Sequence, residues 1–223
     1  MKNKTIFIAI VLLLAGGVGY YIWQDLIVRS VFDKGKVADN TLLEQPKQTK
    51  EVSLDNAGIE QNAKPNIPAP DLNRPINVTE NLDEAAKKAY IAKINETSMT
   101  LKKKTDSFDD WLVLGIYRKA IGDYKGAKEI WEYTAALRPG NFIPFNNLGD
   151  LYAYFLKDNK KAEENFNKAI ELSPNRVHVY YSFYDFYRYV LKDDAKAKAL
   201  LQKGIAANPG SASQGLQDLL NNH

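Results

Sequence analysis

The residue types that could carry catalysis are scarce in this sequence. It contains two histidines, His178 and the terminal His223, and no cysteine. Neither histidine has a second candidate ligand at the spacing that metal sites use, and without cysteine there is no thiol nucleophile, disulfide or thiolate zinc site. We therefore expect no metal, no cofactor and no enzymatic activity.

Three pairs of adjacent carboxylates are the remaining candidates for acid–base chemistry. They are Asp109–Asp110, Glu163–Glu164 and Asp193–Asp194. Adjacent residues on a helix do not face each other, so such a pair cannot act on one substrate atom. The first and last pairs lie near expected helix starts, where negative charge interacts favourably with the helix dipole. We interpret all three pairs as structural.

The elements that would position these residues follow from a repeat in the C-terminal half. Prolines close three blocks at 35-residue intervals, and an alanine precedes each proline by twelve residues. The blocks run from Trp111 to Pro139, from Phe145 to Pro174 and from Tyr180 to Pro209. The alanines are Ala127, Ala162 and Ala197, each followed four residues later by Trp131, Phe166 or Leu201. The prolines should end helices, because proline cannot continue the helical hydrogen-bond ladder.

The blocks also share a pattern upstream of each alanine. It consists of Trp111, Leu114, Gly115 and Arg118 in the first, Phe145, Leu148, Gly149 and Tyr152 in the second, and Tyr180, Phe183, Tyr184 and Tyr187 in the third. The whole pattern resembles the tetratricopeptide repeat, which reads W-x2-L-G-x2-Y, then A-x3-F, then P over 34 residues. The resemblance implies two antiparallel helices per block, with the small residues where the helices approach closely. Blocks two and three carry one extra residue, which we expect in the turn between the two helices.

These patterns predict an all-α fold, a right-handed tetratricopeptide-type solenoid of about three repeats with capping helices. The repeats are expected near 108–141, 142–176 and 177–210. Their helices should span 108–121, 124–137, 142–156, 160–172, 177–191 and 194–207. An amphipathic helix over 82–103 should cap one end, and a short helix over 211–222 should cap the other. The helical domain thus covers 82–223.

An apolar run at the N-terminus predicts a membrane segment. Residues Thr5 to Trp23 contain no charge, and in a helix they would span about 28 Å, close to the thickness of a bilayer core. We predict a single-pass transmembrane anchor within residues 1–32. The alternative is a cleaved signal peptide, because Ala15, Gly16 and Gly17 have the small side chains of a cleavage site. The flanking charges place the C-terminal domain on the extracytoplasmic side of a cell membrane.

Residues 33–81 are predicted to be a disordered linker. The segment is rich in Pro, Gln and Asn, and its part from Asp55 to Pro75 lacks aromatic residues. Such a composition buries too little apolar surface to offset the entropy of ordering. The sequence therefore predicts a tether between the membrane segment and the helical domain.

The functional prediction is protein or peptide binding. A net charge of +3, with lysines interleaved among acids, argues against nucleic acid as a ligand, and nothing indicates a small-molecule substrate. The resemblance implies a concave groove lined by the first helix of each repeat. Its predicted partner-binding residues are Asn146, Asp150, Tyr154, Tyr181, Asp185, Arg188 and Tyr189. We thus expect a non-catalytic membrane-tethered scaffold, or alternatively an accessory subunit docked on an envelope enzyme or a secretion or assembly complex.

Overall fold

The computed structural model describes residues 65–222, which belong to the second of two compact units, Met1–Ile59 and Glu60–His223. The predicted transmembrane anchor, the alternative signal peptide and residues 33–64 of the predicted linker lie outside the described residues. Within residues 65–222, no helix is both long enough and apolar enough to cross a membrane.

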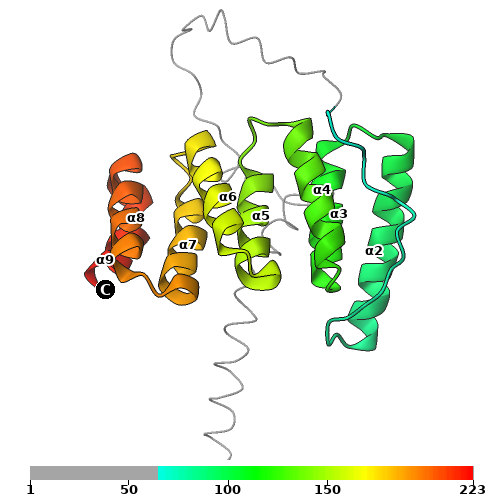
Figure 1. The fold of residues 1–223 in the computed structure, drawn as a ribbon, viewed down its shortest axis with the longest axis horizontal. Helices are drawn as coiled ribbons and strands as arrows, with labels where there is room; N and C mark the ends of the chain where they lie inside the picture. The colour runs from blue at the N-terminus through cyan, green and yellow to red at the C-terminus, as the bar shows by residue number, and fades with distance from the viewer. Residues whose placement is uncertain (1–64, 223) are drawn as a thin grey trace, which may run out of the picture. The chain divides into compact units, whose positions relative to one another are not determined.

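Helices follow one another in chain order through this part of the protein (Figure 1). They are α2 (Glu84–Lys103), α3 (Phe108–Ala120), α4 (Tyr124–Leu137), α5 (Ile143–Asp150), α6 (Asn159–Leu172), α7 (Val177–Asp185), α8 (Asp194–Ala207) and α9 (Gln214–Asn221). A π-helical turn extends α5 over Leu151–Leu156, another extends α7 over Phe186–Leu191, and a 3-10 turn, Gly210–Ser213, precedes α9. Residues 65–222 contain no strand, which confirms the all-α prediction for this part of the chain.

Small residues allow the two helices of each pair to pack closely, as predicted. A Cβ added at Gly115 would lie 2.2 Å from Nε1 of Trp131, and one at Gly149 would lie 2.7 Å from the Phe166 ring. Ala127, Ala162 and Ala197 are all fully buried. The close partner of each glycine is thus an aromatic ring of the second helix, which fixes the register between the two helices.

Aspartates at 35-residue intervals start the second helices. The side chains of Asp123, Asp158 and Asp193 accept hydrogen bonds from the backbone N–H groups three residues later, at 2.9, 3.1 and 2.9 Å. This is the usual way to satisfy a free donor in the first turn of a helix. The spacing is visible in the sequence and marks each second helix as clearly as the alanines do.

The extra residue of blocks two and three is absorbed by the π-helical turns, within the last turn of the first helix rather than in the connection after it. The N–H of Asp158 donates to the carbonyl of Tyr152. In the first pair, the N–H of Asp123 donates to the carbonyl of Arg118, so the bond in the second pair spans one residue more. A left-handed residue, Lys157 with φ 57°, then ends the first helix. A π turn can lengthen a helix by one residue without shifting the helix that follows.

The prediction that the linker continues to residue 81 differs from the structure. Residues 65–82, which we call the strap, run in an extended conformation against the helices (Figure 1). Their side chains alternate, with Leu72, Arg74, Ile76 and Val78 half-buried and the residues between them exposed. Main-chain hydrogen bonds and ion pairs supplement this small apolar surface, and a composition argument does not count them.

Candidate functional site

The predicted partner-binding residues lie on two neighbouring first helices and their π-helical turns. Asn146 and Asp150 belong to α5, and Tyr181 and Asp185 belong to α7, which packs against α5. Tyr154, Arg188 and Tyr189 lie on the two π turns. The structure therefore brings the predicted residues onto adjacent elements, although their surroundings differ from one another.

Two of these residues are used in packing. Asn146 is only 8% exposed, so its amide does not line an open surface. The Tyr181 hydroxyl lies over α9, where a Cβ added to Gly215 would be only 2.0 Å from its oxygen. The helix α9 therefore covers the surface of α7 that would have faced a further repeat.

Arg188 points towards the second helix of its own pair. Its guanidinium forms an ion pair with Asp194, the first residue of α8. Both side chains are exposed, so this ion pair contributes little to stability. The ion-pair partner of Arg188 is thus Asp194, although Arg188 and Asp185 lie on one stripe of the sequence.

Asp185 and Tyr189 are the members of the stripe best suited to contact a partner. Tyr189 is 65% exposed, and its ring stands edge-on to Tyr184, with the centroids 6.5 Å apart. Asp185 is half-buried, and burial raises the pKa of its carboxyl to about 6. A desolvated carboxylate beside an exposed aromatic ring is a common composition of a protein-binding surface.

Asp185→Asn should stabilise the protein at neutral pH. Because folding raises the pKa of this carboxyl from 3.8 to about 6, the charged form opposes folding above pH 6. That penalty should disappear as the pH falls through 6 towards 4. We expect Asp185→Asn to raise the free energy of unfolding by about 1–2 kcal/mol at pH 7.5, after allowance for partial exposure.

Denaturant unfolding at several pH values would measure this difference. Asp106→Asn, which removes an exposed carboxylate from the turn before α3, is the matched control for a general effect of charge. A stabilisation by Asp185→Asn that persists unchanged at pH 4 would show that the carboxyl is not desolvated.

The candidate metal ligands do not come together in residues 65–222. This part of the chain has no group of three or more His, Cys, Asp or Glu residues that could hold a metal ion. His178 is exposed, and the centroid of its ring lies 5.4 Å from that of Phe142. Partial desolvation against the protein and the nearby charge of Arg176 lower the pKa of its imidazole.

The second helix pair matches a known family. A sequence model described as "Tetratricopeptide repeat" matches residues 144–176, which coincide with α5, its π turn and α6. The chain therefore contains a tetratricopeptide repeat. No curated protein matches the chain. Repeats of this family generally mediate contacts between proteins, so protein binding is the general function expected here.

The tyrosine of the repeat signature shows what is unusual about the first pair. The Tyr152 hydroxyl donates to Glu132 of α4 at 3.1 Å, and the Tyr187 hydroxyl donates to Glu163 of α6 at 2.8 Å. Each tyrosine thus ties a first helix to the second helix of the preceding pair. In the first pair, Arg118 stands in the tyrosine position.

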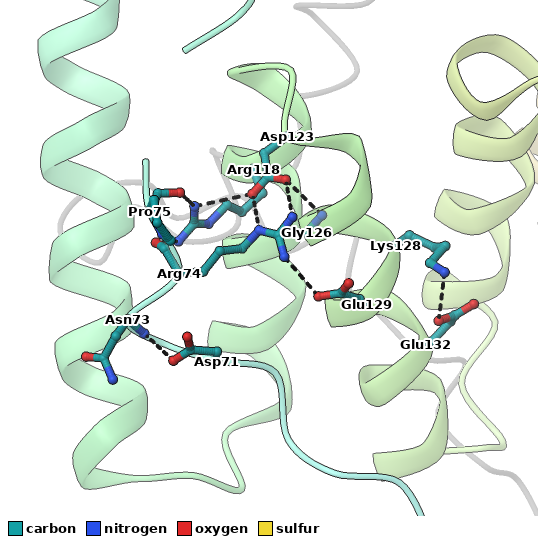
Figure 2. Close-up of polar contacts among 10 residues, drawn as sticks. All are labelled: Asp71, Asn73, Arg74, Pro75, Arg118, Asp123, Gly126, Lys128, Glu129 and Glu132. Carbon is teal, nitrogen blue, oxygen red and sulfur yellow. Dashed lines mark hydrogen bonds and ion pairs between the residues drawn. The ribbon is translucent and has the colours of Figure 1, made fainter. Parts of the chain in front are cut away.

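Arg118 binds the strap instead of a neighbouring helix. Its side chain is 2% exposed, and it donates to the carbonyls of Arg74 and Pro75, both at 2.8 Å (Figure 2). It also lies 3.3 Å from the carboxylate of Asp123. A guanidinium can serve two consecutive carbonyls because its donors form a planar fork, whereas tyrosine has one hydroxyl.

Arg74, which belongs to the strap, binds carboxylates of the helical domain in return. It binds both carboxylate oxygens of Asp123, at 2.7 and 2.9 Å, and Glu129 at 3.1 Å (Figure 2). Asp123 therefore caps α4 and also accepts hydrogen bonds from the side chains of Arg74 and Arg118. Sequence reasoning missed this cluster, although the arginine in the tyrosine position and the alternation from Leu72 to Val78 were the available signals.

Proposed function

We propose that this tetratricopeptide-repeat protein is a non-catalytic scaffold that binds a protein or peptide on its first helices. The supporting observation is that the exposed ring of Tyr189 and the desolvated carboxylate of Asp185 occur on the same first helix and its π turn. An aromatic ring supplies contact area at low entropic cost, and a desolvated carboxylate favours a partner with a donor or a positive charge.

We also propose that the repeats form a right-handed solenoid of three repeats and that the protein is attached to a cell membrane. The apolar run from Thr5 to Trp23 would act as the single-pass anchor, with the repeats on the extracytoplasmic side. The binding face would be the concave side, made by α3, α5 and α7. Asp150 and Tyr154 would contribute the edges of the contact, with Asp185 and Tyr189 at its centre.

Partner recovery from cells that make the protein tests the proposed binding face. The bait should begin at residue 60, because the compact unit is Glu60–His223 and includes the strap. Tyr189→Ala combined with Asp185→Asn should reduce recovery of bound proteins by tenfold or more, since truncating central contact residues typically costs about 2 kcal/mol or more of binding. Thermal unfolding should show that the double variant remains folded.

Charge reversal on a second helix is the matched control. Lys160 and Lys161 are exposed on α6, and Lys160→Glu with Lys161→Glu should leave recovery unchanged. If the lysine variant loses the partner and the Tyr189 and Asp185 variant retains it, the partner binds the second helices and the proposed face is wrong.

A further inference from the structure

The strap is held in the way that a separate extended peptide would be held. The N–H groups of Thr79 and Glu80 donate to the carbonyl of Ile121, at 2.9 and 3.4 Å. Lys102 of α2 donates to the side chain of Asn73 at 2.7 Å, and Tyr124 of α4 donates to Glu80. Main-chain hydrogen bonds with alternate side chains turned inward are the common mode of recognising extended peptides.

The site that holds the strap is a surface formed by three consecutive helices, which we call the α2–α4 seam. It is formed by Lys102 of α2, Arg118 of α3, the α4 N-cap Asp123, and Glu129 in the second turn of α4. The later seams are bridged directly, by Tyr152 with Glu132 and by Tyr187 with Glu163. Only at the α2–α4 seam, within the described residues, does the side chain in the tyrosine position bind main-chain carbonyls of another segment.

The contacts define which segment fits this seam. The carboxylates of Asp123 and Glu129 select an arginine, and the buried guanidinium of Arg118 selects the two carbonyls of an arginine and the residue after it. That following residue is Pro75, whose ring favours an extended chain. Half-buried Leu72 and Ile76 flank the arginine at two residues on either side.

We propose that the α2–α4 seam is a docking site for an extended Arg-Pro segment, filled by the chain's own residues 72–80. The same seam accepts residues 72–80 of a second copy of this chain when its own strap is displaced. This site lies apart from the stripe proposed for partner binding and does not rest on that proposal. It needs no contacts beyond those described, because the second copy presents the same side chains and carbonyls.

An intact chain keeps its own seam closed. A segment joined to its site by a short connection has an effective concentration on the order of millimolar. Residues 72–80 are joined to α2 by Asn81, Leu82 and Asp83 alone, so a micromolar concentration of free segment cannot compete with them. Weakening the chain's own strap should therefore open the seam to the same segment supplied in solution.

The test uses the full chain in detergent and a fluorescein-labelled peptide with the sequence of residues 70–82. Arg74→Glu with Ile76→Asp displaces the chain's own strap by repelling Asp123 and removing an apolar contact. This variant should bind the peptide at least tenfold more tightly than the unaltered chain does. Addition of Arg118→Tyr should weaken peptide binding at least tenfold, and a peptide with glutamate at position 74 should not bind.

Circular dichroism and the emission of the buried Trp111 and Trp131 report whether each variant is folded. A folded strap-displaced variant that does not bind the peptide would overturn the proposal. So would equal binding with and without Arg118→Tyr, because the peptide would then occupy another site.

A second experiment covers the case in which the displaced variant does not fold. The chain has no cysteine, so single cysteines can be placed at Glu80 and Tyr124, which are in contact across the seam. Chains carrying Glu80→Cys are mixed with chains carrying Tyr124→Cys and treated with a short bismaleimide after brief exposure to mild denaturant. A crosslinked heterodimer supports exchange of straps between copies, whereas crosslinking no greater than for two Glu80→Cys chains overturns it.

Discussion

A fragment that begins at residue 83 should unfold about 10 °C below one that begins at residue 60, a difference that corresponds to roughly 3–5 kcal/mol in a domain of this size. Removal of the strap exposes the apolar surface that Leu72, Ile76 and Val78 cover. It also leaves Arg118, which is 2% exposed, without the carbonyls of Arg74 and Pro75. A buried cation that loses its acceptors is strongly destabilising.

Thermal unfolding of the two fragments, followed by circular dichroism, measures this effect. Arg118→Tyr in the longer fragment restores the residue of the repeat signature but cannot bind two carbonyls, so it should reproduce most of the loss. Asn77→Ala, at an exposed position of the strap, should leave the unfolding temperature unchanged. Equal unfolding temperatures for the two fragments would show that the strap does not stabilise the helices.

Gly115→Ala should destabilise the domain by about 3 kcal/mol, a large effect for one methyl group. The added Cβ would lie 2.2 Å from Nε1 of Trp131, a fully packed ring. That nitrogen donates to the carbonyl of Leu112 at 3.2 Å, so displacement of the ring also breaks a buried hydrogen bond. The contact joins α3 to α4, and neighbouring repeats depend on each other for stability.

Gly140 provides the matched control for this substitution. It lies in the connection between α4 and α5, and a Cβ added there would meet nothing within 4 Å. Denaturant unfolding of the 60–223 fragment, monitored by tryptophan emission, should show little change for Gly140→Ala. If the two variants are equally stable, Trp131 does not pack against Gly115 and the register of the first pair is wrong.

Helix positions were largely predictable because each helix buries one regular stripe of side chains. The helix predicted over 160–172 is α6, Asn159–Leu172, and the predicted capping helix over 82–103 is α2, Glu84–Lys103. Alanine and the large apolar residue four positions later occupy the same buried face in all three pairs, so their spacing identifies the second helices. The π turns were not predictable in the same way, because a turn that absorbs one residue leaves the rest of the pattern unchanged.

The strap was missed because its attachments do not depend on its own composition. Two of its acceptors are main-chain carbonyls, which every residue has, and the donor is Arg118, which is far along the sequence. A low content of apolar residues predicts disorder only when no partner elsewhere supplies the missing interactions. The alternation of Leu72, Arg74, Ile76 and Val78 is the sequence feature that indicates an extended, half-buried segment.

The candidate binding residues were only partly predictable for a related reason. Helical spacing shows which side chains share a face, but it does not show what covers that face. Tyr181 is covered by α9 and Asn146 is buried. Arg188 forms an ion pair with Asp194, the first residue of the next helix. Asp185, which is half-buried, and Tyr189, which is exposed, remain the residues suited to contact a partner.

The direction of the strap determines how the repeats would bear a mechanical load. Asn73 lies beside Lys102 near the end of α2, and Thr79 lies beside Ile121 at the end of α3, so the strap runs antiparallel to α2. Tension applied towards residue 65 would therefore act along the strap and load its hydrogen bonds and ion pairs together, in shear. Tension applied directly at Glu84 would instead break the contacts of α2 one helical turn at a time. Because forced unfolding is governed by the unfolding rate, the strap would lengthen the lifetime of the folded repeats under tension.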